Sequence, residues 1–535
     1  MIKKILSSKI HSITGAAILV GVTSLLSRII GMIRDRLFAH YYGAGTVMDA
    51  YYAAFKIPDA VYNLLIIGAL SAGFIPVFIE VMKKDKDDSW RVVNTVINIL
   101  GSILVVFSLI AIWKVRTLIH WLVPGFSGEE FELTIQLSRI MFLSPLILGL
   151  SSIFGSVLQS YKAFAIYSMT PIMYNLGIIT GTLILVPIFG TIGLAYGVVL
   201  GALLHLAIQL PSVCKYGYRY RPIFEFKNPA VRTIGKLMIP RMLGMATHQI
   251  DVITITVLAS TVGTGALSVF SYADNLQTVP SAIIGISFAV ALFPTLSELA
   301  TERKFDEMKS QIARTARQIL WLIIPLTIVF LLLRAQIVRV ILGTGQFDWN
   351  DTFLTAQCLA FFSISIFAQS LTPMLARSFY ALKNTWTPFT ISIVSTLVNL
   401  GAGLYATPRY GIVGLVAGYS LSMIIQTSLL WVLLHKKIGS LNESTIVKLL
   451  AKLSLAAVGM GFVIQGFKYV LGTMLNIDTF IGIFTQGFMS GIIGLVIYGL
   501  ICYLLRVEEM QIFVESFKRK WLKVKPDVEI GRIEE

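Results

Sequence analysis

Apolar segments long enough to cross a lipid bilayer follow one another along almost the whole of this chain. A transmembrane helix needs about 20 mostly apolar residues, and only helices or closed barrels satisfy their backbone hydrogen bonds inside a membrane. Charged residues make up 13% of the 535 residues, against about 25% in an ordinary soluble domain. The sequence therefore predicts an all-α polytopic membrane protein with about 14 transmembrane helices. The expected spans are 12–38, 50–81, 92–113, 133–158, 165–187, 191–213, 234–258, 266–297, 315–341, 353–381, 387–406, 411–434, 447–471 and 479–505.

The positive charges are concentrated in alternate loops between these segments. The formal net charge is +16, which in a soluble protein would suggest nucleic-acid binding. Here basic loops such as 215–236 alternate with loops that carry few cations, such as 43–45 and 343–345. That is the positive-inside pattern of a membrane protein, so we expect no nucleic-acid partner. With an even number of spans, both termini are expected in the cytoplasm, and the tail after Arg506 is expected to form an amphipathic helix on the membrane surface.

Cysteine and histidine offer no pattern for a metal or redox centre. The three cysteines, Cys214, Cys358 and Cys502, are far apart in the chain and have no metal-binding or redox spacing. The six histidines form no zinc motif. We therefore expect neither a metal nor another cofactor.

The two halves of the chain resemble each other at an offset of about 220 residues. The stretch PIFGTIGLAYG at 187–197 matches PRYGIVGLVAG at 408–418, and Asn175 matches Asn399. Each half holds six spans that begin on the same side, which predicts parallel repeats and transport by alternating access. The expected domains are an N-lobe at 1–221, a C-lobe at 222–440, two extra helices at 441–506 and a cytoplasmic amphipathic tail at 507–535.

Charged side chains lie inside several of the apolar segments. Arg28 and Arg34 lie in the first one, and a charge at mid-bilayer costs about 2.5–3.5 kcal/mol on insertion scales. Such groups face a water-filled cavity or a protein partner rather than lipid, so we expect a cationic cavity able to bind an anion. Asp35 is a candidate partner of Arg34. Lys56, early in the second span, either faces the same cavity or reaches the outer interface.

Other polar and small residues in the spans have both structural and functional interpretations. His248 and Asp251 are three residues apart and can share a helix face, either as a proton-responsive pair or as a structural contact. Asn175 and Asn399 are expected to hydrogen-bond between helices. Glycines four residues apart predict close helix packing: Gly177/Gly181, Gly193/Gly197, Gly414/Gly418 and Gly487/Gly491. Prolines at related positions in the two halves interrupt long spans and predict bends: Pro58, Pro76, Pro280 and Pro294.

With these residues in view, the chain resembles the MurJ family of lipid II flippases in the MOP exporter superfamily. The resemblance covers nearly the whole length, and its most specific part is SRIIGMIRD at 27–35. It implies that the first-helix arginines line a cationic cavity for the pyrophosphate and sugar headgroup, and that the helices of 447–505 form a groove for the lipid tail. The other matching motifs are YGAG at 42–45, DA at 49–50, FKIP at 55–58, GALS at 68–71, FIP at 74–76, QID at 249–251, YAD at 272–274, LFPTLS at 292–297 and FYAL at 379–382. The substrate-binding residues expected from this resemblance are Arg28, Arg34, Asp35, Asp49, Lys56 and Asp274.

The chain departs from the family's pattern at positions where the family commonly has charged residues. Tyr62 and Asn275 stand where arginines are common, and Ile67 stands where a glutamate is common. These departures weaken the specific prediction of lipid II as the substrate. Arg241 and Arg377 are candidate compensating cations.

A sodium site found in some members is not expected here. Its carboxylate positions on spans seven and eleven are occupied by Ile255 and Gly403 in this chain. Coupling to the membrane potential needs no such site, because moving one charge yields about 2.3 kcal/mol per 100 mV.

These features together predict a transporter and not an enzyme. The expected function is transfer of the lipid-linked peptidoglycan precursor to the outer leaflet of the bacterial inner membrane, with cell-wall synthases as candidate partners. Two alternatives keep the same fold: a flippase for another polyprenyl-diphosphate-linked oligosaccharide, and a multidrug-type exporter, which a cationic cavity disfavours. A membrane enzyme acting on prenyl diphosphates would need acidic metal-binding motifs, and the loops contain none. A scaffold that binds cell-wall partners without transport also stays open.

Overall fold

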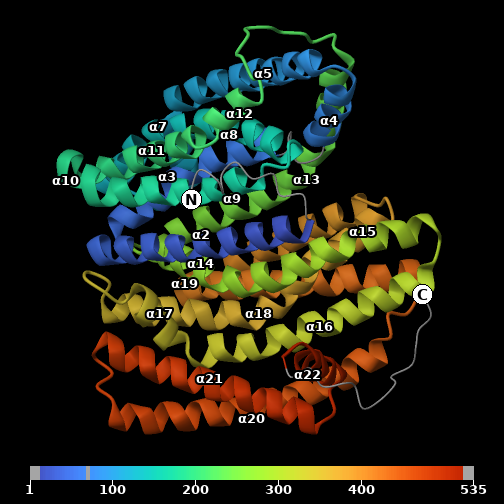
Figure 1. Cartoon of the computed structure of the whole chain (residues 1–535). Coiled ribbons are helices and arrows are strands. Elements are labelled where there is room, and N and C mark those ends of the chain that lie inside the picture. The colour runs from blue at the N-terminus through green and yellow to red at the C-terminus, as the bar shows by residue number, and fades with distance from the viewer. Residues whose placement is uncertain (1–12, 68–72, 522–535) are drawn as a thin grey trace. The chain divides into compact units, whose positions relative to one another are not determined.

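The computed structural model describes residues 13–67 and 73–521, which are mostly helical and contain no strand. Figure 1 follows the helices from α2 near the N-terminus to α22 near the C-terminus. The GALS motif at 68–71 and the end of the predicted tail, 522–535, lie outside the described residues. The helices are α2 (Ile13–Tyr42), α3 (Thr46–Tyr62), α4 (Ile75–Lys84), α5 (Lys86–Trp113), α6 (Val115–Leu122), α7 (Gly128–Met141), α8 (Leu143–Ser160), α9 (Phe164–Thr180), α10 (Val186–Phe189), α11 (Gly193–Ala207), α12 (Leu210–Lys215), α13 (Pro229–Ser260), α14 (Ala266–Ser281), α15 (Ser287–Thr301), α16 (Phe305–Leu332), α17 (Arg334–Leu342), α18 (Trp349–Ala381), α19 (Trp386–Ile438), α20 (Glu443–Met474), α21 (Phe480–Leu504) and α22 (Glu508–Trp521).

The helical, polytopic architecture predicted from the sequence is confirmed. Within the described part of the chain, nine helical stretches are long and apolar enough to cross a membrane, or ten if the bent helix α13 is counted. The number of fourteen spans stays a prediction. α22 supplies the helix expected in the tail, with acidic residues in its first turn.

Two of the long apolar stretches each contain a sharp change of direction at one glycine. In the stretch Phe164–Lys215, Gly190 has φ 66° and ψ −157°. In α19, Gly411 has φ 60° and ψ −143°. This backbone conformation is essentially restricted to glycine. The two glycines occupy the same position of the matched motifs in the two halves, so the two halves share this backbone conformation at equivalent positions.

A second pair of equivalent glycines allows the chain to pack closely beside each turn. A Cβ atom added at Gly193 would lie 2.5 Å from the carbonyl carbon of Leu185, and one added at Gly414 would lie 2.4 Å from the carbonyl oxygen of Ala406. Each glycine therefore brings the chain after the turn against the backbone of the chain before it. Each long stretch consequently consists of two helical arms joined at the glycine, so α19 covers two predicted spans.

Proline-linked irregularities also recur in the two halves. Pro58 in α3 is followed by a π-helical turn at Asn63–Ile67, and Pro280 in α14 is followed by one at Ala282–Ile286. Proline lacks the N–H that a regular helix requires, and π-helical turns accommodate an extra residue in the helix. The irregular segments expected at these two prolines are therefore present.

The chain divides into two compact units. The first unit comprises Met1–Tyr272, Ile341–Thr352 and Asn399–Leu415, and the second comprises Ala273–Val340, Phe353–Val398 and Val416–Glu535. This division follows spatial contacts, whereas the predicted lobes follow the sequence repeat. The predicted boundaries after residues 221, 440 and 506 stay predictions.

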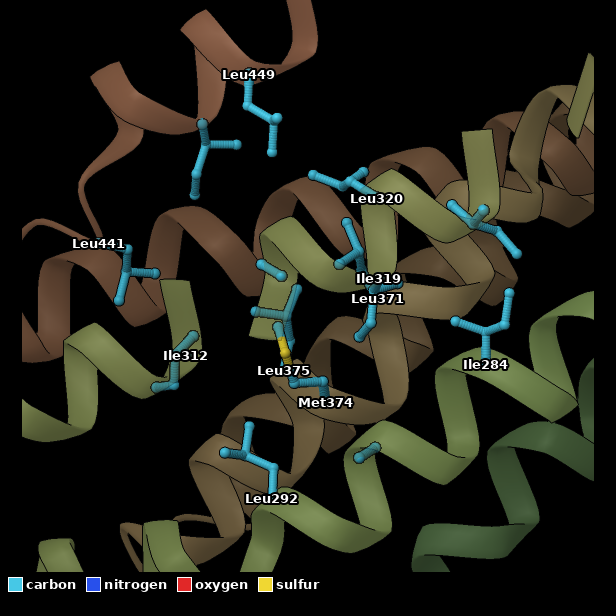
Figure 2. Packing of buried hydrophobic residues seen from close by; sticks show 14 of the residues in the cluster. Ile284, Leu292, Ile312, Ile319, Leu320, Leu371, Met374, Leu375, Leu441 and Leu449 are labelled. Atoms are coloured by element: carbon cyan, nitrogen blue, oxygen red, sulfur yellow. The ribbon is translucent and has the colours of Figure 1, made fainter. Parts of the chain in front are cut away.

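Each unit has its own buried core. In the second unit, Figure 2 shows Ile319 and Leu320 of α16 beside Leu371, Met374 and Leu375 of α18. In the first unit, aromatic rings fill one end of the helices (the aromatic cluster): Phe74, Phe78, Trp90, Phe154, Tyr161, Tyr216 and Tyr218. Inside a membrane the stability of such cores comes mainly from van der Waals packing and interhelical hydrogen bonds.

Glycines bring α9 and α11 into direct backbone contact in the first unit. A Cβ atom at Gly177 would lie 2.2 Å from the Cα atom of Gly201, and one at Gly181 would lie 2.3 Å from the Cα atom of Gly197. The close packing predicted from the glycine spacing is therefore confirmed for this helix pair.

Replacing Gly177 with alanine is expected to lower the free energy of unfolding by about 3 kcal/mol, because the new methyl group meets rigid backbone and forces the helices apart. The measurement is the midpoint of thermal unfolding of the detergent-solubilised protein. Gly101→Ala in α5 is the matched control, since a Cβ atom there meets nothing within 4 Å. Its stability should be unchanged or higher by about 0.5–1 kcal/mol. Equal midpoints for the two variants would contradict the packing argument.

Candidate functional site

Arg34 in α2 is held in place by a carboxylate and an amide. Its Nε and Nη2 atoms donate to Asp35 Oδ1 at 3.0 and 2.8 Å, and its Nη1 atom donates to Asn175 Oδ1 at 3.0 Å. The arginine side chain is 22% exposed and that of Asp35 is 8% exposed. A guanidinium group has five N–H donors, so two stay available, one on each Nη atom. The expected partnership of Arg34 with Asp35 is confirmed, and the arrangement leaves donors for an anion.

Asn175 in α9 positions this guanidinium group. Its own Nδ2 atom donates to the carbonyl oxygen of Pro171 at 3.0 Å, which directs Oδ1 toward α2. A Cβ atom added at Gly31 would lie 3.9 Å from that Oδ1 atom, so α9 passes close to α2 here. The predicted interhelical hydrogen bond of Asn175 is confirmed. Its partner, Arg34, was not identified from the sequence, since the only signal was the repeat.

Arg28 lies on the same helix as Arg34 and is half-buried. It is six residues earlier, or about 9 Å along the helix axis. Within the part of the chain that the structure describes, its side chain has no hydrogen bond or ion pair. Two guanidinium groups with available donors therefore lie along one helix. Their role in substrate binding stays a prediction.

Asp49 in α3 is completely buried, and its carboxylate binds the first turn of α14. Its Oδ2 atom accepts from the backbone N–H of Gly265 at 2.5 Å, and its Oδ1 atom accepts from that of Ser268 at 2.7 Å. These N–H groups belong to the helix N-terminus, where backbone donors lack partners within the helix and the helix dipole favours a negative charge. In this conformation the carboxylate is fully engaged, and the expected substrate contact of Asp49 stays a prediction.

Asp49 belongs to a larger set of contacts, which we call the latch, formed by segments 36–49, 265–272 and 341–351 of the first unit. The latch joins regions of the chain that are more than 200 residues apart. Its other contacts are Tyr272 Oη to Gly43 O (3.2 Å), Arg36 Nη1 to Ile341 O (3.3 Å), Gln346 N to His40 O (3.0 Å), His40 Nδ1 to Thr344 Oγ1 (3.0 Å) and Ala44 N to Asp351 Oδ2 (3.0 Å). No sequence pattern indicated these contacts, because they depend on tertiary structure.

Three further predicted positions lie in the first unit: Lys56, Arg241 and Tyr62. Lys56 is half-buried in α3 and interacts electrostatically with Asp59. Arg241 is exposed on α13. Tyr62, at the position of a family arginine, shares a hydrogen bond of 2.6 Å between its Oη atom and Ser152 Oγ. A polar contact between helices thus occupies the place where the resemblance implies a charged residue.

In the second repeat the equivalent asparagine bonds to a carboxylate and not to an arginine. Asn399 in α19 donates through Nδ2 to Asp251 Oδ1 in α13 at 2.6 Å, and both side chains are buried. The interhelical hydrogen bond expected for Asn399 is therefore confirmed. In the first repeat, by contrast, the equivalent Asn175 accepts from an arginine. His248 is exposed and, among the described residues, makes no hydrogen bond to Asp251, so the structure does not pair these two residues.

Two predicted site residues lie in the second unit. Asp274 in α14 accepts from Gln277 Nε2 through Oδ1 at 2.9 Å. Arg377 in α18 donates through Nη1 to the carbonyl oxygen of Ile286 at 3.4 Å, beside the π-helical turn of that unit. Their substrate-binding and compensating roles stay predictions. The described residues contain no cluster of three or more histidine, cysteine or acidic side chains that could hold a metal ion.

The second unit also contains an apolar pocket of about 590 Å³. It is formed by α16, α21 and α22, and almost all of its lining is hydrocarbon. α21 is the second of the two helices expected to form a lipid-tail groove. Representative lining residues are Trp321 and Leu326 of α16, Val496 and Tyr503 of α21, and Met510 and Phe513 of α22.

The fold is shared with solved membrane transporters. A solved structure described as the inward-facing conformation of a multidrug resistance MATE family transporter of that superfamily aligns with a TM-score of 0.66, at 16% identity, over 78% of this chain and 96% of that chain. A solved lipid II flippase MurJ in an inward closed conformation aligns with a TM-score of 0.74, at 24% identity, over 92% of this chain and all of that one.

The sequence comparisons define the family. The family model described as lipid II flippase MurJ matches residues 38–484, so this chain belongs to the MurJ family. A probable lipid II flippase MurJ of Haemophilus influenzae is 27% identical over 512 residues, which cover 92% of this chain and all of that protein. One of Buchnera aphidicola is 29% identical over 494 residues, covering 89% of this chain and 96% of that protein.

Proposed function

We propose that this protein moves lipid II, the lipid-linked peptidoglycan precursor, from the cytoplasmic to the outer leaflet of the bacterial inner membrane. The observation that carries the proposal is the oriented guanidinium group of Arg34, with Arg28 on the same helix. Arginine donates paired, charge-assisted hydrogen bonds to phosphate oxygens. The names of its curated relatives, lipid II flippases, support the same substrate.

The apolar pocket supports a separate place for the lipid tail. A polyprenyl chain loses nothing by staying in an apolar environment, whereas its diphosphate cannot cross hydrocarbon without compensating charges. In this scheme the headgroup binds the arginines of α2 while the tail follows the surface of α21. No bond is made or broken, so we propose a transporter and not an enzyme.

The latch supports alternating access as the mechanism. Its loops are those that carry few cations, and the positive-inside rule places them on the outer side, with both termini in the cytoplasm. The latch would be closed while the headgroup enters from the cytoplasm and would open to release it. We propose the membrane potential as the driving force, since it acts on charge without a dedicated ion site. Cell-wall synthases are proposed as partners that consume the product.

A flippase for another polyprenyl-diphosphate-linked oligosaccharide is the second candidate. The arginines recognise the diphosphate, which such lipids share, and not the sugars. Tyr62, at a position where the resemblance implies an arginine, binds Ser152 instead, and this departure weakens the specific assignment of the headgroup to lipid II. A multidrug-type exporter of organic cations is disfavoured by the same arginines.

The test is replacement of the host's own lipid II flippase in depleted cells, with wild-type chain and Arg28→Ala at matched expression. Wild type should restore growth and outer-leaflet lipid II. Arg28→Ala should transport about tenfold more slowly, because a charge-assisted hydrogen bond contributes about 1.5 kcal/mol. Arg28→Lys should retain part of the rate. A well-expressed wild type that restores neither growth nor lipid II in the outer leaflet would favour the second candidate.

A further inference from the structure

The segment between α12 and α13 is fixed against α5. Two tyrosines at its start belong to the aromatic cluster. The ring of Tyr216 stacks on Tyr161 with centroids 4.3 Å apart, and Tyr218 lies edge-on to Phe154 with centroids 5.0 Å apart. The beginning of the segment is thereby anchored in the core of the first unit.

Two asparagines of α5 then bind the backbone of the following residues. Asn94 donates to the carbonyl oxygen of Arg219 at 3.0 Å and accepts from the N–H of Arg221 at 3.0 Å. Asn98, one turn further on, donates to the carbonyl oxygens of Arg221 and Ile223 at 3.0 and 2.9 Å. The segment takes part in these hydrogen bonds through its main-chain atoms only. The side chains of residues 219–223 can therefore be replaced without removing these hydrogen bonds.

The chain then returns along α5 toward its N-terminal end. Glu225 forms an ion pair with Arg91, about two turns before Asn98. Residues 219–227, which we call the interfacial loop, therefore run toward Asn98 and back, with their tip near Pro222.

The position of the interfacial loop along α5 places it at one boundary of the membrane. From residue 92 to its end at Trp113, α5 has no charged residue. That length is about 33 Å, close to the roughly 30 Å of a hydrocarbon core. Arg91 consequently marks the level where the hydrocarbon core begins, and Asn98 lies about 10 Å deeper along the axis. Glu225, which pairs with Arg91, is therefore level with the boundary between lipid headgroups and acyl chains, and the tip of the loop lies up to about 10 Å inside that boundary.

The side chains that the interfacial loop exposes suit that depth. Tyr220, Phe224 and Phe226 are 62%, 50% and 61% exposed, and the last two rings are stacked. Aromatic rings are enriched at membrane interfaces. Three exposed cations accompany these rings: Arg219, Arg221 and Lys227. Long basic side chains reach from the acyl boundary to lipid phosphates.

We propose that the interfacial loop docks into an anionic phospholipid surface. The three aromatic rings enter the acyl boundary, and the arginines and lysine bind lipid phosphates. The net positive charge of the loop is complementary to anionic lipid headgroups. A loop that faced water would leave three large aromatic rings exposed to solvent. The docked loop would hold the start of α13 at a fixed depth in the membrane.

The test uses the full chain with its three native cysteines replaced by serine and a spin label at Phe226→Cys. The protein is reconstituted in vesicles of phosphatidylcholine alone or mixed with phosphatidylglycerol. Accessibility to oxygen and to a water-soluble nickel chelate gives the depth of the label. A second label site, Tyr220→Cys, guards against a local defect at residue 226. Asp87→Cys, exposed near the start of α5, is the matched control outside the membrane.

In anionic vesicles the Phe226 and Tyr220 labels should show a several-fold higher ratio of oxygen to nickel accessibility than the Asp87 label. The ratio should fall in neutral vesicles, and Arg219→Gln with Arg221→Gln should remove the difference between the two lipid compositions. Nickel accessibility equal to that of Asp87 in both vesicles would overturn the proposal and indicate that the loop faces water or a protein. A depth independent of lipid charge and of both arginines would overturn the anionic part.

Discussion

Replacing Arg34 with alanine is expected to abolish lipid II transport while leaving the protein folded. The guanidinium group is oriented by Asp35 and Asn175 before substrate arrives, so its remaining N–H donors bind a phosphate without further loss of side-chain freedom. Loss of paired, charge-assisted bonds from a partly buried site costs about 3 kcal/mol. That is a decrease of at least about 100-fold in the transport rate, measured as lipid II reaching the outer leaflet.

Three further variants separate substrate binding from structure. Arg34→Lys keeps the charge but loses the planar fork, so it should retain only a small part of the rate. Asn175→Ala should weaken substrate binding more than it lowers the maximal rate, because Asn175 acts by positioning the arginine. Arg139→Ala, on an exposed position of α7, removes an arginine away from the site and should transport normally. Normal transport by Arg34→Ala would exclude this arginine as a headgroup ligand.

The sequence allowed the class of fold and part of the site to be predicted for definite physical reasons. Apolar length and the loop charges predict a polytopic helical membrane protein without any tertiary information. The Arg34–Asp35 contact was predictable because the two residues are neighbours. The PxxGxxG motif showed the repeat, but the positive φ of Gly190 and Gly411 was not anticipated from it.

The partners of the repeat asparagines show where prediction from sequence ends. Asn175 and Asn399 were both expected to bond to another helix, and both do. Their partners, Arg34 and Asp251, have opposite charges, and nothing in the local sequence around either asparagine indicates which partner it meets. The repeat therefore places an asparagine at equivalent positions in the two halves. The residue on the neighbouring helix determines whether that asparagine bonds to a positive or a negative side chain.

The latch was not predictable either, and it provides the second large effect. Replacing Asp49 with alanine is expected to open the latch, because the N–H groups of Gly265 and Ser268 lose their acceptors. Buried donors without partners cost about 1–3 kcal/mol. A total of about 3 kcal/mol shifts the closed–open equilibrium by about 100-fold. Asp49→Asn keeps one acceptor oxygen and should produce a smaller shift.

The opening is measured as the alkylation rate of Ser271→Cys, in a chain whose native cysteines are serine, by a membrane-impermeant maleimide. Ser271 is buried within the latch segment 265–272, so its cysteine should react slowly in the parent and at least about tenfold faster with Asp49→Ala. Asp478→Ala is the matched control. It removes an exposed carboxylate that lies outside the latch segments, so alkylation should not change. If Asp49→Ala leaves the alkylation rate at the parent value, other contacts hold the latch closed. In that case the burial of this carboxylate against α14 serves helix stability and not the transport cycle.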